Sequence, residues 1–183
     1  MLFRSLCPTR LFTGQALYRE LDGISQAPDA AEVAQRVQRY WRPYHAALRG
    51  ELDRLRAAHG QVVLFDGHSI KSELPWLFDG RLWDLNLGCA DGSSCAPELR
   101  ETLTAILAGQ SRFTHRVDGR FKGGHITRHY GQPGQNIHAV QLEMCWTCYM
   151  QEQAPYAWDE ARAAQVQPLL RQLVQAMLEY RQR

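Results

Sequence analysis

Apolar residues recur every three or four positions between residues 29 and 59, a spacing that predicts a helix with one buried stripe. Pro43 lies inside this stretch and is expected to kink or split the helix, because proline removes one backbone donor. Gly60 is expected to end the helix. The stripe predicted to be buried comprises Val33, Val37, Tyr40, Trp41, Tyr44, Leu48, Leu52 and Leu55.

Two short apolar runs predict β-strands. Residues 62–65 (Val-Val-Leu-Phe) follow the helix directly, and their β-branched and aromatic side chains favour a strand buried on both faces of a parallel sheet. Residues 137–143 predict a second strand, in which Val140 and Leu142 face one way and Glu143 the other. The segment between the first strand and the next helix has no predicted element, and loops of that length usually carry function.

Two further helices complete the pattern, over residues 96–108 and 159–180. Helices alternating with strands predict an α/β fold and a single domain over residues 1–183. Their apolar positions, expected to be buried, are Leu99, Leu103, Ile106 and Leu107 in the first and Val166, Leu169, Leu170, Leu173, Val174, Met177 and Leu178 in the second.

The composition is that of an ordinary globular protein: 45% of the 183 residues are apolar, 22% are charged and the net charge is +2. Because no block of Lys or Arg stands out, nucleic acid is not an expected partner. No apolar run is long enough to span a bilayer, and residues 1–10 do not resemble a signal peptide, so we expect a cytoplasmic protein without a membrane partner. Five cysteines, an odd number, argue against a disulfide framework.

A histidine and a glutamate each stand at the end of a predicted strand, where α/β proteins bind ligands. His68 follows Gly67, and as a metal ligand its ring could be oriented by Asp66. A hydrogen-bonded histidine at a strand end fits its position equally well. Glu143 is a candidate general base, although a solvated glutamate is the more ordinary interpretation of that residue alone.

Residues 119–131 combine cations with a Gly-Gly pair, which suits an anionic substrate. Lys122 and Arg128 are the candidate cations. His125 and His129 have the spacing of a helical zinc pair, but no glutamate follows His125, so the zincin motif is rejected and surface histidines in a loop are expected.

Cys145 and Cys148 have the spacing of a redox or zinc motif. Thioredoxin-type motifs lie early in a βαβ unit, whereas this pair follows the last predicted strand. No second cysteine pair completes a four-cysteine zinc site. A thiol-redox protein is therefore kept only as an alternative.

Several motifs together resemble the N-formylglutamate amidohydrolase family, in order from about Cys7 to the C-terminus. They are Tyr-Trp-Arg-Pro-Tyr-His at 40–45, Phe-Asp-Gly-His-Ser-Ile at 65–70, Asp-Leu-Asn-Leu-Gly at 84–88, Asp-Gly-Ser-Ser-Cys at 91–95, Gly-Arg-Phe-Lys-Gly-Gly at 119–124, Ile-Thr-Arg-His-Tyr-Gly at 126–131 and Ala-Val-Gln-Leu-Glu at 139–143.

The resemblance implies a zinc-carboxypeptidase-like (phosphorylase/hydrolase-like) fold, a mixed sheet flanked by helices. It implies hydrolysis of N-formyl-L-glutamate, a small dicarboxylate, to formate and L-glutamate in histidine degradation. The cofactor implied is a divalent metal, zinc. Its residues here would be His68 as a metal ligand supported by Asp66 and Ser69, Glu143 as the catalytic carboxylate, and Arg128 and Lys122 for the substrate carboxylates.

Members of this family begin with a segment that holds Pro-His-x-Gly and Asn-Arg motifs, which resemble metal and carboxylate ligands of zinc carboxypeptidases. Neither motif occurs upstream of Cys7. We therefore expect an N-terminally truncated domain whose activity is lost with its metal ligands, because a catalytic zinc normally needs three protein ligands. The alternative from another class is a non-catalytic anion-binding or interaction protein.

Overall fold

The computed structural model describes residues 7–11 and 14–181, and the chain divides into two compact units. The smaller unit falls within residues 1–51 and 74–80, and the larger within residues 52–73 and 81–183. All the candidate site residues named from the sequence belong to the larger unit, so the site can be described within one body.

The smaller unit contains a hairpin and the start of the long helical stretch. Strands β1 (Glu20–Leu21) and β2 (Ile24–Ser25) pair antiparallel around Asp22 and Gly23. Both turn residues have positive φ, 52° and 76°, as the two-residue hairpin turn of the I′ type requires. Helix α1 (Ala30–Arg36) then begins at Asp29, whose carboxylate accepts a hydrogen bond from the Glu32 N–H.

The predicted break in the long helix is confirmed. Helix α1 passes through a π-helical turn, η1 (Val37–Trp41), into α2 (Arg42–His59), and Pro43 is the second residue of α2. Gly60, with φ +78°, ends α2 as expected. The predicted buried stripe is wrong for most of its length, since only its member Leu52 is buried. Helical spacing determines which residues share a face, but not whether another element covers that face.

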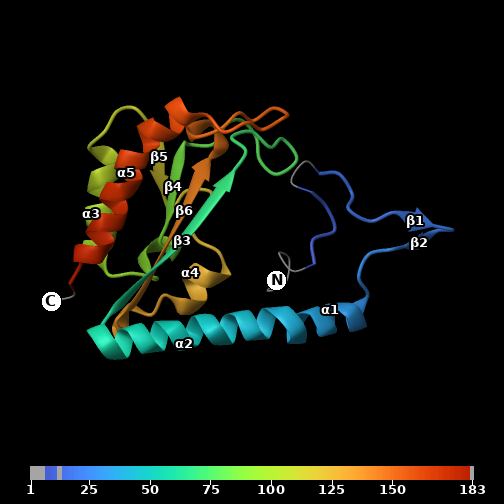
Figure 1. Cartoon of the computed structure of the whole chain (residues 1–183), viewed down its shortest axis with the longest axis horizontal. Helices are drawn as coiled ribbons and strands as arrows, with labels where there is room; N and C mark the ends of the chain where they lie inside the picture. Colours follow the sequence, from blue (N-terminus) through green and yellow to red (C-terminus); the bar gives the residue numbers. More distant parts are fainter. Residues whose placement is uncertain (1–6, 12–13, 182–183) are drawn as a thin grey trace. The chain divides into compact units, whose positions relative to one another are not determined.

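The larger unit is built on a four-stranded mixed sheet (Figure 1). Its strands are β3 (Val62–Ile70), β4 (Leu85–Gly88), β5 (His115–Val117) and β6 (Ile137–Cys145), in the spatial order β3-β6-β4-β5. β3 runs parallel to β6, β4 antiparallel to β6, and β5 parallel to β4. β6 is therefore central, and the alternation predicted for its side chains is confirmed.

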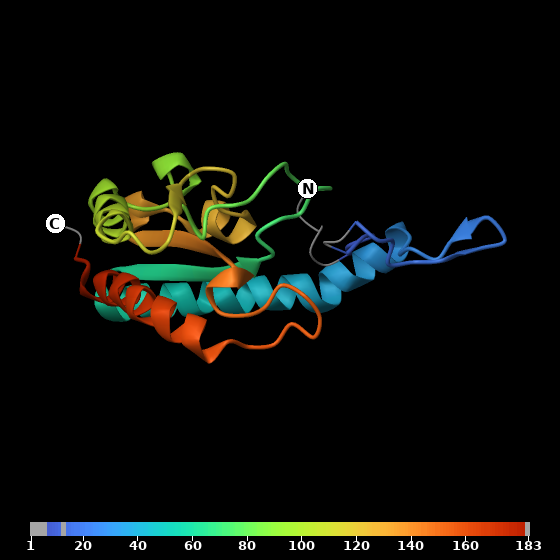
Figure 2. The same ribbon diagram turned by 90° about the horizontal axis from the view of Figure 1, so that it is seen from above.

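Helices α3 (Pro97–Ala108) and α5 (Glu160–Glu179) lie together on one face of this sheet, and the short α4 (His125–Tyr130) lies on the other (Figures 1 and 2). Short 3-10 turns are η2 (Ala90–Gly92), η3 (Pro133–Gln135) and η4 (Trp146–Cys148). The buried side chains of α3 and α5 are Leu99, Leu103, Leu107, Ala163, Val166, Leu169, Leu173 and Met177. No helix in the described ranges is both long and apolar enough to cross a bilayer.

Two strand predictions need correction. The strand predicted to be buried on both faces is β3, and it lies at the edge of the sheet, with Phe65 37% exposed. It also continues to Ile70, so His68 lies within the strand instead of after a glycine turn. β4 falls in the segment for which no element was predicted, because four residues ending in Gly88 are too short to show a period.

Candidate active site

The register of the sheet aligns polar side chains on the face that α4 covers. His68 of β3 pairs with Glu143 of β6, Glu143 pairs with Asn86 of β4, and Asn86 pairs with Arg116 of β5. Residues paired in register project from the same face of a sheet. These four side chains therefore form one row across all four strands, and Glu143 and His68 are direct neighbours in it.

His68 is held by Asp66, two residues earlier on the same face. Its Nε2 lies 3.0 Å from the Asp66 carboxylate, while 48% of its side chain remains exposed. The hydrogen bond with Asp66 raises the pKa of His68, against the opposing effect of burial. Because Asp66 pairs with Nε2, Nδ1 is the ring nitrogen left to accept a ligand, as in a histidine oriented by a carboxylate.

Glu143 is a buried carboxyl group, only 7% exposed. Burial raises its pKa to about 7, with a smaller opposing effect of His68 and a further rise from Asp66. At neutral pH the protonated and ionised forms are therefore both populated. A carboxyl group in that state can take a proton from water and return it to a leaving group, which general acid–base catalysis requires.

Asn86 and Arg116 were not predicted as site residues. Asn86 is 1% exposed, and its Nδ2 donates to the backbone oxygens of Trp83, at 2.8 Å, and Glu143, at 3.2 Å. Asn86 lies in a motif that carried the family resemblance, which was the available signal. For Arg116 there was none, because the three-residue β5 was not predicted and its place in the row depends on pairing with β4.

The glycine-rich segment expected to bind anions packs directly on this face. A Cβ added to Gly88 would lie 2.5 Å from the Gly123 nitrogen, so only glycine allows the two backbones to approach so closely. The N–H of Gly124 donates to Oε1 of the buried Gln141, at 2.7 Å. These contacts fix the backbone around Lys122 over Gly88 and Gln141, which are paired in register one row away from Asn86 and Glu143.

Replacing Gly88 by Ala is expected to lower the free energy of unfolding by about 1–3 kcal/mol, because the added methyl group forces the 122–124 backbone off the sheet. Gly134→Ala is the matched control, since nothing lies within 4 Å of its added Cβ. Urea denaturation of both variants measures the difference. Equal stabilities would show that this segment does not depend on close contact with β4.

The candidate cations differ in their surroundings. Lys122 Nζ forms an ion pair with Asp91, at 2.9 Å, which offsets its charge. Arg128 is exposed on α4. Arg116 has no ion pair or hydrogen bond with any other residue in the described ranges. Of the three, Arg116 stands in the same row as His68 and Glu143.

Three other sequence candidates are not members of the row. Ser69, expected to support His68, projects from the opposite face, where its hydroxyl lies 2.8 Å from that of Tyr149. His125 and His129 lie on the short helix α4, not in a loop, and their rings stack with centroids 4.9 Å apart.

Cys145 and Cys148 are buried, and their thiols donate to backbone oxygens of Trp83 and Asp84. Burial raises the pKa of both thiols to about 12. Since the thiolate is the reactive form, these cysteines are poor nucleophiles at neutral pH. Their contacts tie the end of β6 to the start of β4, which is a structural role.

Within the described residues, no group of three or more His, Cys, Asp or Glu side chains could hold a metal ion. A catalytic zinc site normally takes three protein ligands. His68, Asp66 and Glu143 therefore do not complete a zinc site by themselves, although Nδ1 of His68 could contribute one ligand.

Comparisons with known proteins identify relatives of this chain. Residues 4–150 match the model of the N-formylglutamate amidohydrolase family. The chain is 49% identical over 173 residues to the N-formylglutamate deformylase of Pseudomonas putida, and 47% identical over 173 residues to that of Pseudomonas aeruginosa PAO1. These matches cover 94% of this chain but only 63% and 64% of the two relatives.

Solved structures share the fold. The crystal structure of N-formylglutamate amidohydrolase from Ralstonia eutropha JMP134 superposes with a TM-score of 0.69 and 24% identity, over 96% of this chain and 71% of that one. The gene product Atu2144 from Agrobacterium tumefaciens gives a TM-score of 0.57 and 19% identity, over 82% and 56% of the two chains. The expected mixed sheet flanked by helices is thus confirmed. By its match to the family model and its identity to the two deformylases, the chain belongs to the N-formylglutamate amidohydrolase family.

Proposed function

We propose that this chain contributes the general base and part of the substrate site of a metal-dependent amidohydrolase. Its substrate is N-formyl-L-glutamate, and its products are formate and L-glutamate, a step of histidine degradation. The names of the relatives support the substrate. The observation that carries the reaction type is Glu143, a buried carboxyl group with a pKa raised to about 7, next to the Asp66–His68 pair.

Glu143 has the proton chemistry that formamide hydrolysis needs. In its ionised form it takes a proton from the water whose oxygen attacks the formyl carbon. In its protonated form it gives that proton to the glutamate nitrogen as the C–N bond breaks. Asn86 holds the backbone of Glu143 and keeps the carboxyl group in place on β6.

The proposed cofactor is a divalent metal, zinc, which would supply Lewis acidity toward the water and the formyl oxygen. His68 is its proposed ligand in this chain, through Nδ1, with Asp66 orienting the ring. Because the described residues do not complete a zinc site, the remaining ligands must come from other residues. A zinc-carboxypeptidase-like arrangement of the complete site belongs to the same proposal.

The substrate carboxylates require cations beside the row. Neighbouring strands are about 4.8 Å apart, so the backbone of Arg116 lies roughly 10 Å from that of Glu143. An N-formylglutamate molecule lying across the strands would place its formyl group at Glu143 and a carboxylate within reach of the Arg116 side chain. Arg128 and Lys122 are the other proposed carboxylate ligands, and Lys122 is the weakest of them because it pairs with Asp91.

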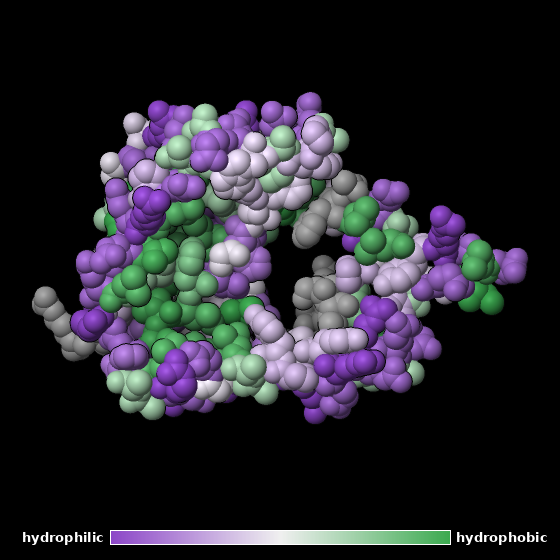
Figure 3. Space-filling model, in the orientation of Figure 1, coloured by the Kyte–Doolittle hydropathy of each residue, from purple (hydrophilic) through white to green (hydrophobic). Residues whose placement is uncertain are grey.

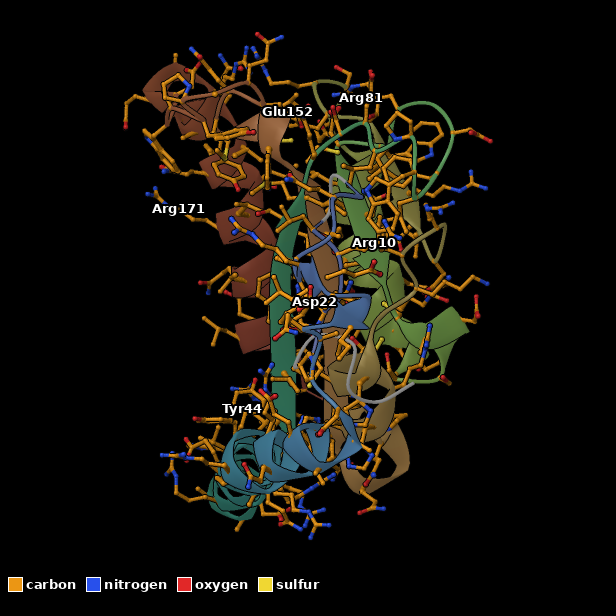
Figure 4. All side chains as sticks on the ribbon, turned by 90° about the vertical axis from the view of Figure 1, so that its right-hand side faces the viewer. Arg10, Asp22, Tyr44, Arg81, Glu152 and Arg171 are labelled. Carbon is orange, nitrogen blue, oxygen red and sulfur yellow. The ribbon has the colours of Figure 1, made fainter. Side chains whose placement is uncertain are left out.

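Replacing a carboxylate-binding arginine by Gln is expected to weaken N-formylglutamate binding by about 1.5–3 kcal/mol, as for the loss of a charged hydrogen bond. Binding of N-formylnorvaline, which lacks the side-chain carboxylate, should change less. Calorimetry on the Arg116→Gln, Lys122→Gln and Arg128→Gln variants makes the comparison. Arg171→Gln is the control, since Arg171 projects from α5 on the other face of the sheet (Figure 4).

The binding results distinguish the candidate carboxylate ligands and also test the proposed substrate. A variant that binds N-formylglutamate no more tightly than N-formylnorvaline has lost the residue that binds the side-chain carboxylate. No binding of either ligand, even by a fusion of this chain to the part of the Pseudomonas putida deformylase that it does not match, would contradict the substrate proposal itself. Binding by that fusion protein without any formate release would favour a non-catalytic anion-binding protein.

A further inference from the structure

Cys89 and Cys95 flank the turn η2, and this turn brings their side chains into contact. The Cys89 carbonyl oxygen accepts hydrogen bonds from the N–H groups of Gly92, at 2.9 Å, and Ser94, at 3.2 Å, so the chain folds back on itself. The two thiols are hydrogen-bonded to each other, and the two residues are 0% and 1% exposed. The candidate active site uses neither of them.

The hydrogen bond between the two sulfurs makes them chemically unequal. It lowers the pKa of Cys95, against the opposing effect of burial, and it raises the pKa of Cys89 together with burial. Cys95 also directly precedes Ala96, the N-cap of α3, where the helix dipole favours a thiolate. Cys95 is therefore the nucleophile of the pair, and Cys89 holds the proton. The Cys145–Cys148 pair differs, since each thiol donates to a backbone oxygen and burial raises both pKa values to about 12.

The turn that covers the two thiols lies at the surface. Asp91 and Ser93 are exposed, and Ala90 and Asp91 have positive φ, 50° and 55°, a conformation that is strained outside glycine. Local opening of a surface turn requires less free energy than global unfolding, and it gives a small oxidant access to the sulfurs. The exposed apolar groove between α5 and α2 (Figure 3), lined in part by Val174 and Leu178, is a separate feature that neither cysteine lines.

We propose that Cys89 and Cys95 form a redox-sensitive modification site, in which a reversible disulfide replaces the two thiols on reaction with a low-molecular-weight disulfide such as oxidised glutathione. The Cys95 thiolate attacks one sulfur of the oxidant, which gives a mixed disulfide and releases one thiolate. That thiolate takes the proton of Cys89, whose sulfur then attacks the Cys95 sulfur and displaces the second thiolate. The second thiolate takes up the proton that Cys95 gave up on ionising. The protein thus loses two hydrogen atoms, and the oxidant is reduced to two thiols.

The two ends of this turn are attached to different parts of the larger unit. At one end, Ser94 is held on β6, because its Oγ donates to the Ala139 oxygen, at 2.7 Å, and its carbonyl oxygen accepts from the Ala139 N–H, at 2.8 Å. At the other end, the Ala90 N–H donates to the oxygen of Lys122 in the glycine-rich segment, at 2.7 Å. A covalent bond holds two sulfurs closer together than a hydrogen bond does. Since β6 is central in the sheet, we expect the Cys89 end to move and its contact with Lys122 to break.

Incubation of the 183-residue chain with oxidised glutathione, followed by alkylation in denaturant, tests the modification. Trypsin cuts after Arg81 and Arg100, so the peptide of residues 82–100 carries both cysteines of the proposed site. We expect this peptide to escape alkylation and to be lighter by two hydrogen atoms, and dithiothreitol should reverse both changes. Cys145 and Cys148 lie on a different tryptic peptide, which should remain alkylated and is the internal control.

Amide exchange on the oxidised chain tests the structural consequence. Exchange at Ala90 should be at least about 10-fold faster than in the reduced protein, because its hydrogen bond to Lys122 is lost, whereas exchange at Ala139 should not change. Cys89→Ser should abolish both the disulfide and the faster exchange. Cys148→Ser, the matched control at another buried cysteine, should leave both in place.

The modification proposal is overturned if the peptide of residues 82–100 stays alkylated after oxidation, or if it keeps a stable mixed disulfide with glutathione. It is equally overturned if Cys145 and Cys148 are oxidised as readily. Disulfide formation with unchanged exchange at Ala90 would overturn the expected movement of the turn. Neither readout requires hydrolysis or a bound metal, so failure of either is distinct from failure of the proposed function.

Discussion

Glutamine in place of Glu143 is expected to raise the free energy of unfolding at pH 8 by about 3 kcal/mol in metal-free protein, because burial raises the pKa of this carboxyl group from 4.5 to about 7. Between these two pH values the folded state binds more protons than the unfolded state. The wild-type protein therefore loses stability as the pH rises through this window, and the loss persists above pH 7. Gln cannot ionise, so the Glu143→Gln variant does not lose stability in this way.

Urea denaturation at pH 5 and pH 8, with a chelator present, measures this effect. At pH 5 the free energies of unfolding of the wild-type and Glu143→Gln proteins should differ by less than about 1 kcal/mol. This pH is only slightly above 4.5, where the folded and unfolded states begin to differ in proton binding. Glu101→Gln, at an exposed position on α3, is the control for replacing a carboxylate. If the free energies of unfolding of the wild-type and Glu143→Gln proteins changed equally between pH 5 and pH 8, the pKa of Glu143 would not be raised in the folded protein.

The larger effect is expected on catalysis. The 183-residue chain alone should release formate from N-formylglutamate barely above the uncatalysed rate, because its described residues offer no set of three metal ligands. A fusion of this chain to the part of the Pseudomonas putida deformylase that it does not match should bind metal and release formate. In that fusion protein, Glu143→Gln should lower kcat/KM by at least about 100-fold, as expected for loss of a general base.

Much of the local structure could be predicted from residue patterns. The alternation in β6 correctly placed Glu143 opposite to Val140 and Leu142, and glycine chemistry correctly ended α2 at Gly60. These features depend on residues close together in the chain. The N-cap of α5, Asp159, also matches the predicted start of that helix.

Features that depend on distant pairing could not be predicted. An apolar run such as that of β3 has the same pattern at the centre or the edge of a sheet, and only its neighbours decide between them. The row from His68 to Arg116 likewise exists because β6 and β4 bring four separate segments into register. Periodicity within one segment carries no information about that register.

Formate release by the fusion protein tests the central claim most directly, that Glu143 is the catalytic base of an amidohydrolase. The wild-type, Glu143→Gln and Glu101→Gln forms of the fusion protein would be compared with equal added zinc, after circular dichroism has verified that all three are folded. The wild-type and Glu101→Gln forms should turn over N-formylglutamate at similar rates, and Glu143→Gln should lose at least about 99% of that activity. Wild-type turnover by the folded Glu143→Gln fusion protein would contradict the account.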